Sequence, residues 1–383
     1  MQSEYASDGA RARLAHIALR ESEVDYQSAW ESFIELMKTE RLDEYARTGP
    51  TAVRMFEDAL EAALSNAYDT GIERGGAGLH AAGQLFLQRV LYRINRLKLF
   101  WYDELSNYDN ERSEYLRAVR DRIEESWQRW ELSQIDVESL RREELRAALV
   151  RRAAADVSPE PSASGLYFRD EVDEAGYRRL LAIASLDGLI EASQLSRTLG
   201  GVSNEIHAMM TRLLVEEYGG GRLNRKHSTF FHVMLTELGM NTEPEGYFEL
   251  VPWEVLAAIN HSFLLSERKR FYLRYVGGLL YTEISVPAAF DNYRAAAERL
   301  GMSEAARGYW ELHIREDERH GRWMLHDVAL PLARKYPAQG WEIVLGYDQQ
   351  KLMSERAGLG VERSVRAASR EAARREFAAE DAA

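Results

Sequence analysis

The sequence predicts an all-α protein. Proline is scarce, with eight in 383 residues. Long stretches carry apolar residues three and four positions apart, which is the helical period, and few stretches alternate apolar with polar residues as a strand does. One such helical stripe consists of Leu87, Val90, Leu91, Ile94 and Leu97.

The length of the chain favours two domains. The segment DVSPEPSASG, which starts at Asp156, contains proline, serine and glycine but no apolar period, and this is typical of a linker. We therefore expect four parts: a helical N-terminal domain (1–155), a linker (156–168), a more apolar helical domain (169–358) and a charged, Ala-rich tail that forms an exposed or frayed helix (359–383).

Glycine-rich breaks separate some of the helices in the second domain. The apolar pattern places these helices at 171–198, 202–218, 224–239, 252–265, 268–298, 303–332 and 338–357.

Composition excludes several classes of function. The net charge is −13, which argues against nucleic acid as a partner because phosphate binding needs a basic surface. There is no cysteine, so disulfides, thiolate metal sites and cysteine nucleophiles are excluded. No apolar run is long enough for a signal peptide or a membrane span. We expect a cytoplasmic protein without membrane contact.

The stretch HIREDERH is the strongest candidate for a metal site. On a helix, His313, Asp317 and His320 share a face about 60° wide. Two imidazoles and a carboxylate on one face form a pre-arranged set of metal ligands, and a carboxylate followed three residues later by histidine recurs in diiron bundles. A solvated face is the alternative, because other charged residues lie between them: Arg315, Glu316, Glu318 and Arg319.

Two carboxylates lie in apolar helical patterns upstream. Glu283 lies within FYLRYVGGLLYTEISVPAAF, where an unpaired buried carboxylate would be unfavourable and would need a partner, a proton or a metal ion. Glu191 follows Asp187 by one turn in SLDGLIEASQLSRTLGG. An exposed position is the alternative for each.

A further candidate pair flanks the Gly triplet of LLVEEYGGGRLNRKH. Glu217 ends one predicted helix, where a negative charge opposes the helix dipole, so another interaction should favour it. His227 begins the next predicted helix, and the two side chains converge if the chain reverses at the glycines. Glu216 and His232 are the nearest competitors for these two roles.

Together these segments supply four carboxylates and three imidazoles, enough for two divalent metal ions. Without thiolates, the set suits iron or manganese better than zinc. Ferritin-like bundles repeat Glu-x-x-His on two helices. The carboxylate-x-x-His spacing occurs once among these helices, which points to a different helical scaffold.

The residues from about 170 to 350 resemble the haem-oxygenase-like diiron oxidases and oxygenases, a family of iron-containing redox enzymes. The resemblance rests on HxxxDxxH at 313–320, on Glu283 upstream, on the Glu-Tyr-Gly-Gly…His block of Glu217 and His227, and on Glu191. It implies a haem-oxygenase-like helical bundle and the metal ligands Glu191, Glu217, His227, Glu283, His313, Asp317 and His320.

The resemblance also implies two Fe(II) ions, with O₂ as co-substrate. One iron would take His227, His320 and Glu191, the other would take His313, Asp317 and Glu283, and Glu217 would bridge them. Surrounding residues would orient the imidazoles. The candidates for that role are Tyr281, Tyr309, Asp187 and Glu316.

The family includes enzymes that oxygenate the nitrogen of amines and guanidines, and we expect this activity on a small amine or an amino-acid-derived substrate of specialised metabolism, with an external electron donor possible. Oxidative C–C cleavage of an amino acid or fatty acid on the same site is the alternative. A metal-free α-helical scaffold protein is the alternative from another class.

The N-terminal domain resembles the helical extension of some N-oxygenating members, which implies a homodimer. Its aromatic residues fit a core or an interface: Phe100, Trp101, Tyr102, Trp127 and Trp130.

For the substrate, the candidate carboxylate anchors are Arg212, Arg222, Arg225, Arg274 and Arg294. Nearby tyrosines tilt the expectation toward a polar, amine-bearing substrate: Tyr272, Tyr275 and Tyr281.

Overall fold

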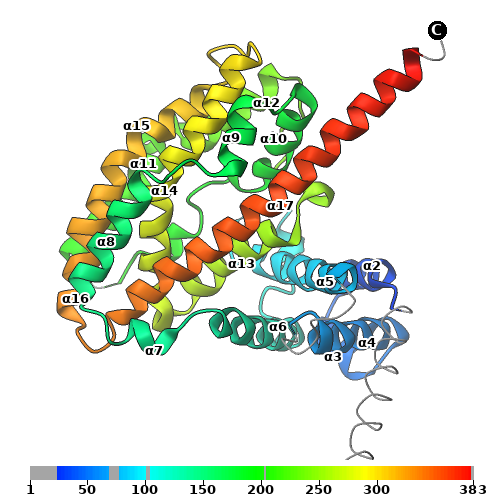
Figure 1. The fold of residues 1–383 in the computed structure, drawn as a ribbon. Helices are drawn as coiled ribbons and strands as arrows, with labels where there is room; N and C mark the ends of the chain where they lie inside the picture. The colour runs from blue at the N-terminus through cyan, green and yellow to red at the C-terminus, as the bar shows by residue number, and fades with distance from the viewer. Residues whose placement is uncertain (1–23, 69–76, 101–103, 202–203, 381–383) are drawn as a thin grey trace, which may run out of the picture. The chain divides into compact units, whose positions relative to one another are not determined.

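The computed structural model describes residues 24–68, 77–100, 104–201 and 204–380. Within them every regular element is a helix, so the all-α prediction is confirmed (Figure 1). Two compact units divide the chain, residues 1–134 and 135–383. No helix among the described residues is long and apolar enough to cross a membrane.

The first unit is built from amphipathic helices around an aromatic core. Phe33 and Phe56 are fully buried and stack with ring centroids 4.9 Å apart. The stripe from Leu87 to Leu97 is buried, as is Trp127, whereas Phe100 is 92% exposed. Trp101 and Tyr102 lie outside the described residues. Its helices are α2 (Tyr26–Met37), α3 (Leu42–Arg47), α4 (Thr51–Asn66), α5 (Ala77–Arg96), η1 (Leu105–Tyr108) and α6 (Glu114–Ser133).

The second unit contains the segments that carry the candidate ligands. Its longer helices are α8 (Leu145–Val157), α9 (Ala163–Asp170), α10 (Glu174–Gly188), α11 (Glu205–Glu217), α12 (His227–Glu237), α13 (Trp253–Glu267), α14 (Tyr272–Arg299), α15 (Gly308–Trp323) and α17 (Trp341–Glu380). Its short elements are α7 (Val137–Leu140), η2 (Leu195–Thr198), η3 (Gly219–Gly221), η4 (Leu223–Arg225), η5 (Phe248–Leu250), η6 (Lys269–Phe271), the π-helical η7 (Met324–Ala329) and α16 (Leu330–Lys335).

The units do not divide where the linker was predicted. Asp156, at the start of that segment, is buried and accepts hydrogen bonds from Tyr347 Oη at 2.8 Å and Lys351 Nζ at 2.7 Å. Arg152 of α8 pairs with Asp348 of α17 at 2.6 Å. These polar contacts hold α8 on the second unit, and sequence periodicity gives no sign of them.

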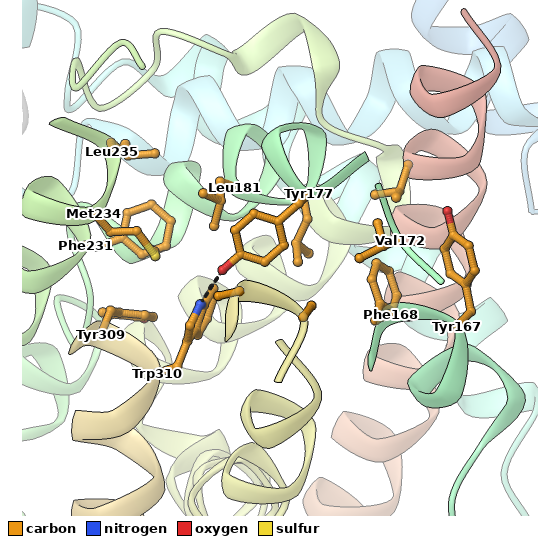
Figure 2. Close-up of a cluster of buried hydrophobic side chains, with 14 residues drawn as sticks. Tyr167, Phe168, Val172, Tyr177, Leu181, Phe231, Met234, Leu235, Tyr309 and Trp310 are labelled. Carbon is orange, nitrogen blue, oxygen red and sulfur yellow. Dashed lines mark hydrogen bonds between the residues drawn. The ribbon is translucent and has the colours of Figure 1, made fainter. Parts of the chain in front are cut away.

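The tail of residues 359–380 is helical, and most of its described side chains are exposed or half-buried. Residues 359–380 continue α17, the long orange-to-red helix of Figure 1, rather than fraying. Val365 is fully buried in an apolar cluster that includes Tyr177 of α10 and Trp310 of α15. In Figure 2 a dashed line joins Trp310 to Tyr177, because Trp310 Nε1 donates to Tyr177 Oη at 2.8 Å. This cluster fixes α15, the helix of the HxxxDxxH motif, against α10.

Helix α14 crosses α17 at close range. A Cβ atom added to Gly277 would overlap the carbonyl oxygen of Ile343, and one added to Gly346 would overlap that of Arg274. The two backbones can therefore meet only where side chains are absent. This crossing positions α14, which carries Glu283.

We predict that Gly277→Ala lowers the free energy of unfolding by about 1–3 kcal/mol, because the added methyl group forces the two backbones apart. The measurement is thermal unfolding followed by circular dichroism. Gly358→Ala on α17 is the control, since a Cβ there meets no atom within 4 Å. It should leave stability unchanged or raise it by up to about 1 kcal/mol. Equal midpoints for the two variants would contradict the close crossing.

Candidate metal centre

The candidate ligands come from five places in the second unit. Glu191 follows α10, Glu217 is the last residue of α11 and His227 the first of α12, while Glu283 lies inside α14. The predicted helix 171–198 is interrupted: α10 ends at Gly188, and Ala192 adopts φ 61°. Glu191 therefore lies on a turn, and not on the continuous helix that the apolar pattern favoured.

Helix α15 contributes the HxxxDxxH motif from its inner face. His313, Asp317 and His320 are all buried, with 4%, 3% and 0% of their surface exposed. Arg315 and Glu318 between them are exposed. The face that carries the motif is thus not a solvated one, although the helix has charged residues on its outer side.

Four side chains meet in a first group: Glu191, Glu217, His227 and His313. His313 Nε2 lies 2.9 Å from Glu191 Oε1, and His227 Nδ1 lies 2.9 Å from Glu217 Oε2. The two imidazoles approach at 3.2 Å between His227 Nδ1 and His313 Nε2. Four potential ligand atoms thus converge on one point.

A second group consists of Glu217, Asp317 and His320. His320 Nδ1 lies 3.4 Å from Glu217 Oε1, 3.4 Å from Glu283 Oε2 and 3.7 Å from Asp317 Oδ1. Glu283 therefore lies beside this group. Glu217 belongs to both groups, with Oε2 toward His227 and Oε1 toward His320.

This grouping differs from the predicted division of the ligands. Sequence reasoning paired His227 with His320, whereas the structure places His227 beside His313 and places His320 with Asp317 and Glu283. The reason is that α12 begins directly against the N-terminal half of α15, and spacing along the chain does not show which turn of α15 it meets.

Hydrogen bonds orient two of the imidazoles. His313 Nδ1 lies 3.0 Å from the carbonyl oxygen of Tyr309 and donates to it, which turns Nε2 toward Glu191 and His227. His320 Nε2 lies 3.1 Å from Glu216 Oε2, which leaves Nδ1 for the second group. Glu216 is held in turn by Arg319 at 2.6 Å. Orientation through the second nitrogen is typical of metal-ligating histidines.

Glu216 and His232 were the alternatives to Glu217 and His227, and other residues were predicted to orient the imidazoles. Glu216 contacts His320 from the outer side, while Glu217 is buried, and His232 is exposed.

Tyr309 Oη donates to Glu191 Oε1 at 2.8 Å, and Glu316 pairs with Arg319. Tyr281 instead packs on Tyr347, with ring centroids 5.3 Å apart. Sequence reasoning missed Phe290, whose ring lies edge-on to His313 at 5.4 Å and for which the sequence offers no signal.

The charges of the cluster shift its pKa values in a consistent pattern. Burial raises the pKa of Asp317 well above its usual range, and the charge of Glu283 adds to this. Burial also raises the pKa of Glu217. It lowers that of His320, but the hydrogen bond and charge of Glu283 outweigh burial and raise the pKa to about 9. Asp317 and Glu217 therefore favour protonation unless positive charge is added, whereas for Glu191 the charge and hydrogen bond of His313 outweigh burial and lower the pKa.

The donor set fits divalent metal ions. Two buried carboxylate oxygens in it accept no hydrogen bond from any described residue: Glu191 Oε2 and Asp317 Oδ1. Buried polar atoms are normally paired, so these require a ligand. Carboxylate oxygens and imidazole nitrogens suit iron or manganese.

A cavity of about 310 Å³ opens beside the two groups. Its wall includes Glu191, Glu217, Glu283, His313 and Asp317, together with residues of α13 and α17. Of the three tyrosines considered, Tyr275 lines it.

The arginines predicted as substrate anchors do not line this cavity. Arg274 pairs with Glu342 at 2.6 Å, and Arg294 pairs with Asp291 at 2.7 Å. Arg212 pairs with Glu216 at 3.3 Å, while Arg222 and Arg225 are exposed. These side chains serve ion pairs or face solvent.

Residues 178–350 match the sequence model of a family described as iron-containing redox enzymes. The second unit therefore holds a domain of this oxidoreductase family, which confirms the resemblance that the motif spacing indicated. Nitrosourea synthase from Streptomyces achromogenes subsp. streptozoticus is similar to this chain, with 25% identity over 242 residues. The match covers 56% of this chain and 51% of the relative, so the chain spans about half of that protein's length.

We predict that Tyr309→Phe weakens binding of Mn(II) by about tenfold or more, because Glu191 loses the hydroxyl that orients it. The measurement is calorimetric titration of metal-free protein. Tyr293→Phe is the matched control: its ring packs on Trp310 in the same aromatic cluster, and no described residue bonds its hydroxyl. Equal affinities for the two variants would show that the Tyr309 hydroxyl does not support the site.

Proposed function

We propose that the second unit is a non-haem diiron oxygenase that uses O₂ to oxidise the nitrogen of a small amine substrate. The observation that carries the proposal is the pair of ligand groups that share Glu217. One group would hold one Fe(II) through Glu191, His227 and His313. The other would hold the second Fe(II) through Glu283, Asp317 and His320, with Glu217 between them.

Two Fe(II) ions, when bound, supply the electrons that activate O₂. The residues of the chain orient the candidate ligands and limit water around them. The hydrogen bonds from Tyr309 and Glu216 fix Glu191 and His320. Phe290 packs edge-on against His313 and limits water on that side of the site.

The stoichiometry of the overall reaction determines which co-reactants the enzyme needs besides O₂ and the amine. One oxygen atom of O₂ forms the new N–O bond at the amine, which loses its proton to that oxygen and becomes a hydroxylamine. The other oxygen atom leaves as water, and this takes two electrons and two protons. We therefore propose that an external electron donor serves the enzyme.

The family match supports oxidation chemistry, and N-oxygenation is supported by the name of the nitrosourea synthase relative, since a nitroso group contains a nitrogen–oxygen bond. Oxidative C–C cleavage on the same site is the alternative outcome. We further propose that the protein acts in the cytoplasm and that the first unit mediates a homodimer, as its resemblance to the helical extension implies.

The test uses the full chain, loaded anaerobically with Fe(II), then mixed with ¹⁸O₂, a reductant and a panel of amines. Mass spectrometry should find a product with one added ¹⁸O on nitrogen. A shortened alkene or aldehyde would instead support C–C cleavage. Failure to consume O₂ above the rate of free iron with every substrate of both kinds would contradict the oxygenase.

We predict that His320→Ala abolishes this product, because the second group loses its imidazole. His232→Ala is the matched control: His232 is exposed on α12 and lies outside both groups. Product formation by the control should equal that of the wild type. Unchanged activity of His320→Ala would remove the second group from the reaction.

A further inference from the structure

Asp187 is a carboxylate of the cavity that neither ligand group uses. It lies near the end of α10 and lines the cavity together with Glu191, Tyr275 and Tyr309. No described residue donates a hydrogen bond to its side chain, and its charge acts on both tyrosines. Asp187 is exposed, so its carboxylate meets the open cavity instead of another side chain and is available to a ligand.

The charge of the cavity wall supports this role. The lining residues include five carboxylates: Asp187, Glu191, Glu217, Glu283 and Asp317. Two divalent ions balance the four that belong to the ligand groups. Asp187 then remains as the negative charge of the wall that no metal ion neutralises.

Among the described residues, no lysine or arginine lines the wall. The five arginines considered as anchors lie elsewhere. Lys226 lies close enough for Glu191 to act on its pKa, but its ammonium group packs over the Tyr218 ring, 4.5 Å from the centroid, and does not line the cavity. A carboxylate on a substrate would thus find no lysine or arginine to pair with in the wall.

Neutral polar groups complete the wall. Helices α13 and α17, which carry no ligand, contribute Ser262, Gln350 and Ser354. Gln350 Nε2 donates to Ser354 Oγ at 3.2 Å, so the amide oxygen of Gln350 is left to accept a hydrogen bond. Acceptors of this kind suit the N–H groups of an amine or guanidine.

We propose that Asp187 binds a positively charged nitrogen group of the substrate, and that this substrate is a protonated amine or guanidine that carries no carboxylate. The inference rests on the proposed function, because two metal ions are needed to balance the other carboxylates. It narrows the proposed substrate class from amines in general to amines and guanidines without a carboxylate.

The test measures binding without turnover. The full chain is loaded with Mn(II), which substitutes for Fe(II) without reacting with O₂ on the timescale of the experiment, and the bound metal is quantified first. Calorimetry then compares two pairs of probes that differ by one carboxylate: 1,4-diaminobutane with ornithine, and agmatine with arginine. We expect one or both amines to bind about tenfold or more tightly than the matching amino acid.

Three variants assign the effect to Asp187. Asp187→Asn should weaken binding of the amine about tenfold or more, since a charged partner is lost, while thermal stability stays equal or rises. Asp187→Glu should restore part of the affinity. Glu174→Gln is the matched control, because Glu174 is an exposed carboxylate on the same helix.

Equal binding of each amine and its amino acid would overturn the inference, as would an unchanged affinity in Asp187→Asn or the failure of both amines to bind at millimolar concentration. These outcomes count only for protein that has taken up Mn(II). Failure to take up the metal would instead contradict the proposed function, so the two failures are distinguishable.

Discussion

The gathering of four carboxylates in the interior is the constraint on which the second unit depends. Glu217, Glu283 and Asp317 are buried, and Glu191 is half-buried. Side chains of this kind are rarely buried without a partner, because an uncompensated charge in a low-dielectric interior is strongly unfavourable. Here Glu217 lies between His227 and His320, and Glu191, Glu283 and Asp317 lie close by. Three imidazoles offset part of the charge. Divalent cations would offset the rest, and they would also use the unpaired oxygens of Glu191 and Asp317.

The surrounding helices bring these side chains together from distant parts of the chain. The close crossing of α14 and α17 at Gly277 and Gly346 sets the position of Glu283. The aromatic cluster around Trp310 holds α15 against α10 (Figure 2), and this places His313 near Glu191. Packing far from the metal centre thus determines whether its ligands converge.

Much of this arrangement could be predicted from the sequence. The helical period identified the all-α class, and the spacing of His313, Asp317 and His320 placed them on one helical face. The pairing of ligands could not be predicted, because it depends on where α12 meets α15. The turn that carries Glu191 was also missed, since the apolar pattern continues past Gly188 although the helix does not. The domain boundary was missed because the polar contacts of Asp156 and Arg152 leave no periodic signal.

The most direct test of the central claim is the iron content of the metal-free protein after anaerobic titration with Fe(II) and removal of unbound metal. We expect about two Fe(II) ions retained per chain in the wild type, and loss of iron from both positions in Glu217→Ala, because both groups share this residue. Retention of much less than about one ion per chain by the wild type, or equal retention by the variant, would contradict a shared two-metal site.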